Sequence, residues 1–134
     1  MSFTIKKIDH VVIAVQDLAA AKQTYQSLYG LQVEAEGDAP ALGISNVVFK
    51  VGDGSLELAA PLGDDPRNLV RRRLEDGEGL FMLSLEVDDL DAAVADLRAQ
   101  GATATDPSSG PSRLSFISPK NAHGVRLQLI QRGR

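Results

Sequence analysis

The sequence predicts an α+β fold built from two βαβββ modules that share one core. The main observation is an internal repeat. Residues 8–18 return as residues 80–90, and both segments end in a valine, an acidic residue and a leucine before an alanine-rich stretch. The second observation is length, because 134 residues suffice for one domain whereas modules of about 65 residues would be marginal alone. We expect one domain made of two modules, residues 5–61 and residues 79–132. A helical connection, residues 62–78, joins them.

The first module contains four segments that alternation of apolar residues predicts as strands. They are residues 7–15, 31–36, 46–51 and 55–60. Asp17 is placed to cap a helix that begins at Leu18 and ends at Gly30. Gly52-Asp53-Gly54 is a hairpin signal between the last two strands, and the Gly, Pro and Ala stretch at 37–43 is expected to be a loop.

The connection and the second module follow the same logic. A helix over Pro66 to Leu74 is expected, with the proline in its first turn. Asp88 or Asp89 then caps a helix that runs to about Gln100. The predicted strands of this module are residues 80–87, 102–104, 113–118 and 124–131.

Composition excludes several classes of protein and of site. The chain has no cysteine, so it forms neither disulfides nor thiolate metal sites, and any metal needs His and carboxylate ligands. A net charge of −4 and 4% aromatic residues argue against nucleic-acid binding. We interpret Arg71-Arg72-Arg73 as a solvated helix face among acidic neighbours rather than an anion site. Because no secretory signal or apolar run of about 20 residues is present, we expect a cytoplasmic protein without a membrane span.

Strand periodicity predicts which polar side chains face a common cleft. In the first module this face carries His10 with Val12 and Ala14, and it carries Glu57 on the last strand. In the second module this face carries side chains from two strands. The first strand contributes Leu80, Met82, Ser84 and Glu86, and the last strand contributes Arg126, Gln128 and Ile130.

The duplicated pattern resembles the vicinal oxygen chelate superfamily of glyoxalases, bleomycin-resistance proteins and extradiol dioxygenases, and is most similar to its methylmalonyl-CoA epimerase branch. The segments that carry the resemblance are Ile8-Asp9-His10, Asp17-Leu18, Gly30-Leu31, Leu56-Glu57-Leu58, Pro61-Leu62, Gly77-Glu78-Gly79-Leu80, Glu86-Val87-Asp88-Asp89, Ser118-Pro119-Lys120 and Gly124-Val125. The resemblance implies a pseudo-two-fold pair of modules whose eight longer strands form a curved mixed sheet around a cleft. It also implies a homodimer.

By this resemblance, the superfamily's four metal-ligand positions are His10, Glu57, Met82 and Gln128. Met82 stands where a histidine is expected, and its thioether is a poor ligand for Zn, Co, Ni or Mn. Gln128 stands where a glutamate is expected, so an oxygen remains but its charge is lost. The metal set is then His10, Glu57 and Gln128 with water, and any divalent ion is held weakly or not at all.

Catalytic residues are placed by the same resemblance. Ala41 occupies the position where epimerases carry the glutamate that removes the α-proton, so Glu86 is the remaining candidate base. The alternative is that Glu86 has a structural role in its Glu-Val-Asp-Asp motif. Three further side chains are candidates for substrate contacts in addition to Met82 and Ser84. They are Lys120, His123 and Arg126, although His123 also suits an exposed turn.

Two functions follow from this pattern. One is an enzyme of the lyase, isomerase or epimerase type that acts on a small oxygenated or thioester metabolite through a degenerate metal site. The other is a metal-free protein that binds or sequesters a small molecule. Extradiol dioxygenase activity is disfavoured because Fe(II) sites of that class use two histidines and a carboxylate.

Overall fold

The computed structural model describes residues 2–133 and has the predicted α+β composition. Its strands and helices, in chain order, are β1 (Ile5–Ala14), α1 (Leu18–Tyr29), β2 (Gln32–Ala39), β3 (Ile44–Val51), β4 (Gly54–Pro61), α2 (Leu69–Leu74), β5 (Gly79–Val87), α3 (Leu90–Ala99), β6 (Ser112–Ile117) and β7 (Leu127–Arg132). Short 3₁₀ helices, η1 (Pro40–Leu42) and η2 (Pro119–Asn121), precede β3 and follow β6. The elements divide into two compact units, residues 10–81 and residues 2–9 with 82–133. We call them the first and the second unit.

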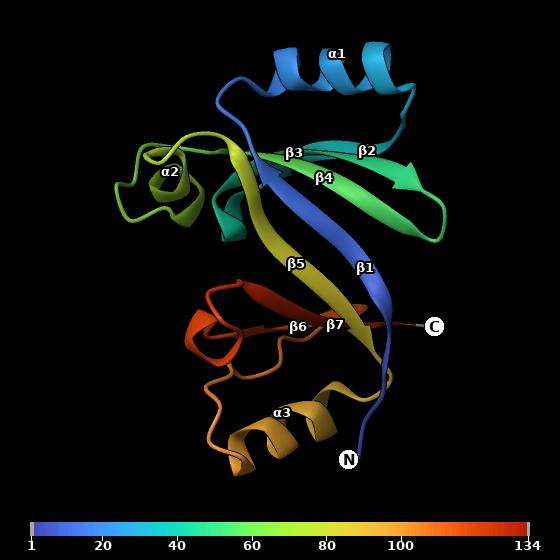
Figure 1. The fold of residues 1–134 in the computed structure, drawn as a ribbon, viewed down its shortest axis with the longest axis vertical. Helices are drawn as coiled ribbons and strands as arrows, with labels where there is room; N and C mark the ends of the chain where they lie inside the picture. The colour runs from blue at the N-terminus through green and yellow to red at the C-terminus, as the bar shows by residue number, and fades with distance from the viewer. Residues whose placement is uncertain (1, 134) are drawn as a thin grey trace. The chain divides into compact units, whose positions relative to one another are not determined.

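In the first unit the strand order is β2-β3-β4-β1. β2, β3 and β4 are antiparallel neighbours, whereas β4 pairs with β1 in parallel. Helix α1 lies over this sheet (Figure 1), and an aliphatic and aromatic core fills the space beneath it. The buried members of this core are Val15, Val47, Phe49, Leu58 and Ala60. Partly buried α1 residues Leu18, Ala21 and Tyr25 pack against them at the spacing expected of one helix face.

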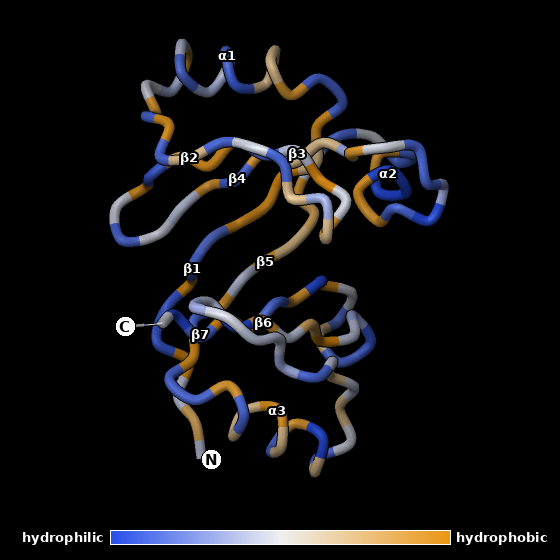
Figure 2. Tube along the Cα trace, turned by 180° about the vertical axis from the view of Figure 1, so that it is seen from behind, coloured by the Kyte–Doolittle hydropathy of each residue, from blue (hydrophilic) through white to orange (hydrophobic). Residues whose placement is uncertain are grey.

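In the second unit β7 lies between β5 and β6. It is parallel to β5 and antiparallel to β6. Helix α3 supplies Leu90, Ala93 and Val94 to a core that also contains Val87 and Leu129. Figure 2 shows orange and blue residues alternating along α3, as expected of a helix that buries one side. These burial patterns confirm the predicted helix-facing sides of the strands.

Both predicted helix caps are confirmed. The side chain of Asp17 accepts a hydrogen bond from the Ala20 backbone N–H at 3.0 Å, and Asp89 does the same for Ala92 at 3.0 Å. Gly30 ends α1 with a left-handed φ of 67°, a conformation that favours glycine. The repeated acidic positions of the sequence therefore start both helices.

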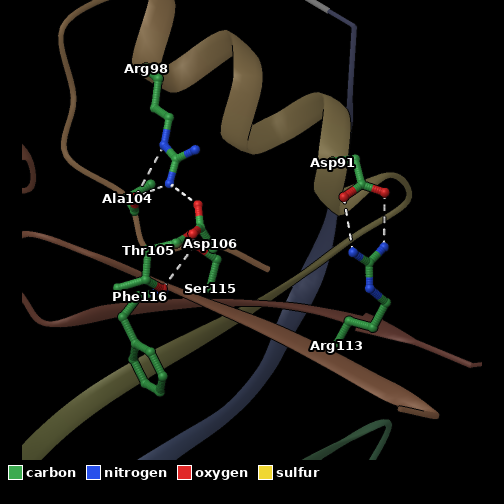
Figure 3. Close-up of polar contacts among 8 residues, drawn as sticks. All are labelled: Asp91, Arg98, Ala104, Thr105, Asp106, Arg113, Ser115 and Phe116. Carbon is green, nitrogen blue, oxygen red and sulfur yellow. Dashed lines mark hydrogen bonds and ion pairs between the residues drawn. The ribbon is translucent and has the colours of Figure 1, made fainter. Parts of the chain in front are cut away.

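The expected strand at residues 102–104 is wrong, because only an isolated bridge from Ala104 to Ile117 forms there. The described residues consequently contain seven strands rather than eight. Side-chain contacts also hold this segment (Figure 3). Arg98 donates to the Ala104 carbonyl at 2.7 Å and to Asp106 at 2.8 Å. These contacts add to two backbone hydrogen bonds, from the Thr105 N–H to the Phe116 carbonyl and from the Ser118 N–H to the Thr103 carbonyl.

Three boundaries also differ from the sequence prediction. β2 continues to Ala39 and η1 follows, so residues 37–43 are only partly loop. Helix α2 begins at Leu69 because the Asn68 side chain caps it, which leaves Pro66 outside its first turn. β7 begins at Leu127 because a turn occupies the preceding residues, with the Val125 N–H bonded to the Ala122 carbonyl. No helix among residues 2–133 is long and apolar enough to cross a membrane.

Candidate functional site

His10 and Glu57 are brought together in the first unit, as predicted. His10 Nε2 lies 3.8 Å from Glu57 Oε1, and 11% and 14% of the two side chains are exposed. The parallel register of β1 and β4 explains this proximity, because Val12 pairs with Glu57 and His10 is two residues before Val12. Both side chains therefore lie on the sheet face opposite α1.

Asn46 joins this pair and was not predicted from sequence. Its Nδ2 donates a hydrogen bond to Glu57 Oε2 at 3.4 Å. The antiparallel register places Val48 opposite Glu57, so Asn46 is a diagonal neighbour on the same face. Alternation along β3 marks Asn46 as facing away from α1, but only the register identifies its partner.

Burial sets the electrostatics of this group. Withdrawal from water raises the pKa of the Glu57 carboxyl above its ordinary value, while the charge of His10 and the hydrogen bond from Asn46 act in the opposite direction. A buried carboxylate beside an imidazole and an amide favours a cation or a hydrogen-bond donor as its ligand.

The loop before β3 supplies no carboxylate to this unit. Ala41 lies in η1, which ends at Gly43 with a φ of 69°. The Asn68 side chain donates to the Gly43 carbonyl at 2.7 Å, and the Leu62 N–H donates to the same oxygen at 2.8 Å. The loop is therefore anchored to the start of α2, and its side chains at this point are those of Pro40, Ala41 and Leu42.

In the second unit, Ser84 and Gln128 are paired residues of the parallel strands β5 and β7. Ser84 Oγ donates to Gln128 Oε1 at 2.7 Å, and both side chains are buried. The amide oxygen that the sequence offered as a metal donor thus has an internal partner.

Glu86 is buried, with 3% of its side chain exposed, and one carboxylate oxygen lies 3.7 Å from Lys6 Nζ. This contact with Lys6 suits the structural alternative for Glu86 as well as a catalytic role. The position of Glu86 on the face opposite α3 follows from the burial of Val87 in the helix-facing core.

The remaining predicted residues occupy different settings in the second unit. Met82 is half-buried on β5. Lys120 is exposed in η2, and His123 is exposed in the turn that follows, with a left-handed φ of 54°. Arg126 precedes β7, and its carbonyl accepts from the Leu83 N–H at 2.9 Å. His123 therefore has the exposed turn position that was its alternative assignment.

The donor chemistry bears on the expected metal. Within the described residues, no group of three or more His, Cys, Asp and Glu side chains gathers at one place. His10 and Glu57 provide one imidazole nitrogen and one carboxylate in the first unit. A tight divalent site needs at least three protein donors, so these two suit an ion only with oxygen donors of another type or water.

The comparisons with known proteins extend over nearly the whole chain. Residues 8–133 match the family model described as a glyoxalase-like domain. Human mitochondrial methylmalonyl-CoA epimerase is 29% identical over 133 residues, which cover 96% of this chain and 76% of that protein. The ethylmalonyl-CoA/methylmalonyl-CoA epimerase of Cereibacter sphaeroides is 30% identical and is matched over 98% of its length, with 95% of this chain covered.

Solved structures give the same result for the fold. The crystal structure of methylmalonyl-CoA epimerase from Mycobacterium tuberculosis has a TM-score of 0.89 at 31% identity, covering 100% of this chain and 93% of that one. A variant of the Streptomyces coelicolor epimerase in complex with 2-nitronate-propionyl-CoA has a TM-score of 0.88 at 30% identity, covering 98% and 100%. These similarities confirm the α+β fold class and the superfamily resemblance.

Proposed function

Because the chain belongs to the glyoxalase-like domain family of the vicinal oxygen chelate superfamily, we propose that it binds a small acyl thioester of coenzyme A and acts on it as an epimerase-like protein. The observation that carries the proposal is the pairing of His10 with Glu57, 3.8 Å apart, in a fold that matches an epimerase over 100% of the chain. Relatives were solved with methylmalonyl-CoA and with 2-nitronate-propionyl-CoA, which are both acyl derivatives of coenzyme A.

We expect the protein to bind a divalent metal ion only weakly. His10 and Glu57 would hold a divalent ion such as Zn, Co, Ni or Mn, and the family resemblance names Gln128 of the second unit as a further oxygen donor. When bound, such an ion would polarise a carbonyl oxygen of the thioester. The hydrogen bond from Ser84 to Gln128 competes with that use of the amide oxygen, and Met82 contributes only a thioether. Both features support weak binding.

Proton transfer at the α-carbon is the second part of the proposed reaction. Epimerisation beside a thioester carbonyl requires a base that removes the α-proton. Position 41 is an alanine, so we assign the base to Glu86, which is buried beside Lys6. Because position 41 supplies no second carboxylate, we expect slow exchange.

Ligand binding without turnover is the second candidate function. The apolar sequence of η1, with Pro40, Ala41 and Leu42, favours it because no carboxylate reaches the ligand from this loop. The two functions share a thioester ligand and differ in whether its α-proton exchanges.

Deuterium exchange separates these functions. Purified protein would be incubated with methylmalonyl-CoA in D₂O, and loss of the α-proton signal would be followed by NMR against a protein-free control. Slow exchange that disappears in Glu86→Gln supports the epimerase-like function. Exchange that persists in that variant contradicts the assignment of Glu86, and exchange at the protein-free rate in the wild-type protein supports ligand binding alone.

Assembly and location complete the proposal. We expect a cytoplasmic homodimer that has no nucleic-acid or membrane partner, from the resemblance, the absence of cysteine and the net charge of −4. Light scattering coupled to gel filtration measures the assembly directly. A mass of about 28.6 kDa, twice the 14.3 kDa of the chain, is the expected result.

A further inference from the structure

Three polar side chains share one face of three adjoining strands in the first unit. His10 is on β1, Glu57 on β4 and Asn46 on β3. The pairs Val12–Glu57 and Val48–Glu57 fix the register on either side of β4, so Glu57 lies between the other two side chains. Only two of the three are residues that the sequence assigned to a metal.

The distances in this group are long for direct contacts. The Asn46 Nδ2 to Glu57 Oε2 distance is 3.4 Å, beyond the roughly 2.9–3.0 Å typical of an N–H···O hydrogen bond. The His10 Nε2 to Glu57 Oε1 distance is 3.8 Å. Two ligand atoms that are each about 2.1 Å from one ion lie roughly 3.0–3.4 Å apart. The group is therefore spaced nearly as the ligands of a shared cation are, and a shift of a few tenths of an ångström closes the longer gap.

Asn46 offers an oxygen to this group at small cost. The two ends of a side-chain amide have almost the same shape, so a half-turn of the amide brings Oδ1 to the position of Nδ2. The turn gives up the 3.4 Å hydrogen bond to Glu57. Without a cation the Oδ1 atom would repel the carboxylate, whereas with a cation both oxygens face positive charge.

Burial favours a cation in the same place. Glu57 is 14% exposed and His10 is 11% exposed, so neither side chain is well hydrated. A carboxylate withdrawn from water is stabilised by an adjacent positive charge. An imidazole nitrogen with one carboxylate and one amide oxygen is a donor set that suits Mn, Co and Ni among divalent ions.

We propose that Asn46 is a third protein ligand that acts with His10 and Glu57 to hold a divalent first-row cation within the first unit. Asn46 thus supplies from β3 a third donor atom, which the thioether of Met82 does not provide. The inference rests on the proposed function only in taking His10 and Glu57 as metal donors, and it adds a residue that neither motif nor repeat identifies.

Binding of Co(II) alone tests the proposal on the full-length protein, by calorimetry and by the visible absorption of the bound ion. Asn46→Ala should weaken the affinity by about 10- to 100-fold, and Asn46→Asp, which keeps an oxygen donor, should restore it. Lys50→Ala removes a side chain from the same face of β3 and should leave the affinity unchanged. Circular dichroism and urea unfolding establish that each variant is folded.

Equal affinity in the wild-type protein and Asn46→Ala would overturn the proposal, as would the absence of Co(II) binding to the wild-type protein. Titration of the Co(II)-loaded protein with methylmalonyl-CoA is run in parallel. If the thioester does not bind while Co(II) binding depends on Asn46, the proposed function fails and the cation site stands.

Discussion

Ser84 and Gln128 form a buried side-chain hydrogen bond of 2.7 Å across paired positions of β5 and β7. The serine hydroxyl donates and the amide oxygen accepts, so the oxygen expected to bind metal is satisfied within the second unit. The bond also makes Gln128 dependent on Ser84, because a buried amide oxygen without a donor is costly.

Ser84→Ala should therefore lower the free energy of unfolding by about 1–3 kcal/mol, the cost of leaving Gln128 Oε1 buried and unpaired. Urea unfolding measures the change. Ser45→Ala is the matched control, because Ser45 bonds to the exposed Asp38 and its loss should cost less than about 0.5 kcal/mol. Equal losses of unfolding free energy in the two variants would show that the buried Ser84–Gln128 bond stabilises the protein no more than an exposed bond does.

The burial of the Glu57 carboxyl should make the stability of the protein depend on pH. Burial raises the pKa of this carboxyl above its ordinary value of 4.5, so the folded protein binds more protons than the unfolded chain between the ordinary and the raised value. The free energy of unfolding should fall as the pH rises through that window. Glu57→Gln cannot lose this proton, so it should gain stability relative to the wild-type protein as the pH increases.

Urea unfolding of both proteins at intervals between about pH 4 and pH 7 checks this dependence. A stability difference between Glu57→Gln and the wild-type protein that stays constant with pH would contradict the burial effect on Glu57.

Arg98 should contribute to both local and global stability, because its side chain bonds to Ala104 and Asp106 in the segment where a strand was expected. Loss of its bonds to Ala104 and Asp106 in Arg98→Ala should cost about 1 kcal/mol. Amide exchange should also accelerate at Thr105, whose N–H bonds to the Phe116 carbonyl at 3.0 Å. Arg72→Ala, on an exposed position of α2, should change neither quantity. Unchanged exchange at Thr105 would refute the role given to Arg98.

Replacing Ala41 by glutamate should increase the rate of α-proton exchange. A carboxylate introduced by Ala41→Glu would stand where the resemblance to epimerases expects the base, so α-proton exchange of methylmalonyl-CoA in D₂O should rise by roughly 10²- to 10⁴-fold. Leu42→Glu, in the same turn of η1, is the matched control and should not raise the rate. If both variants exchange at the wild-type rate, Ala41 is not the position that limits proton transfer.

Local signals were sufficient for most of the fold. The Asp17 and Asp89 caps depend on hydrogen bonds within one turn, and alternation along each strand identified the helix-facing sides. The strand expected at residues 102–104 failed because a ladder needs a partner over several residues, and Ala104 pairs only with Ile117. Pairing between distant segments is not encoded in local periodicity.

The site was predictable only in part for the same reason. The repeat and the resemblance identified His10 and Glu57, which lie 3.8 Å apart as expected. Asn46 was missed because its contact with Glu57 depends on the register of β3 against β4. The Ser84 partner of Gln128 likewise required the register of β5 against β7.

Calorimetric titration of the full-length protein with methylmalonyl-CoA, with free coenzyme A as the reference, tests the central claim most directly. Saturable binding of the thioester that is tighter than binding of coenzyme A, and that weakens in His10→Ala and in Glu57→Ala, is the predicted result. Absence of thioester binding, or affinities that are equal for the two ligands and unchanged in both variants, would contradict the account.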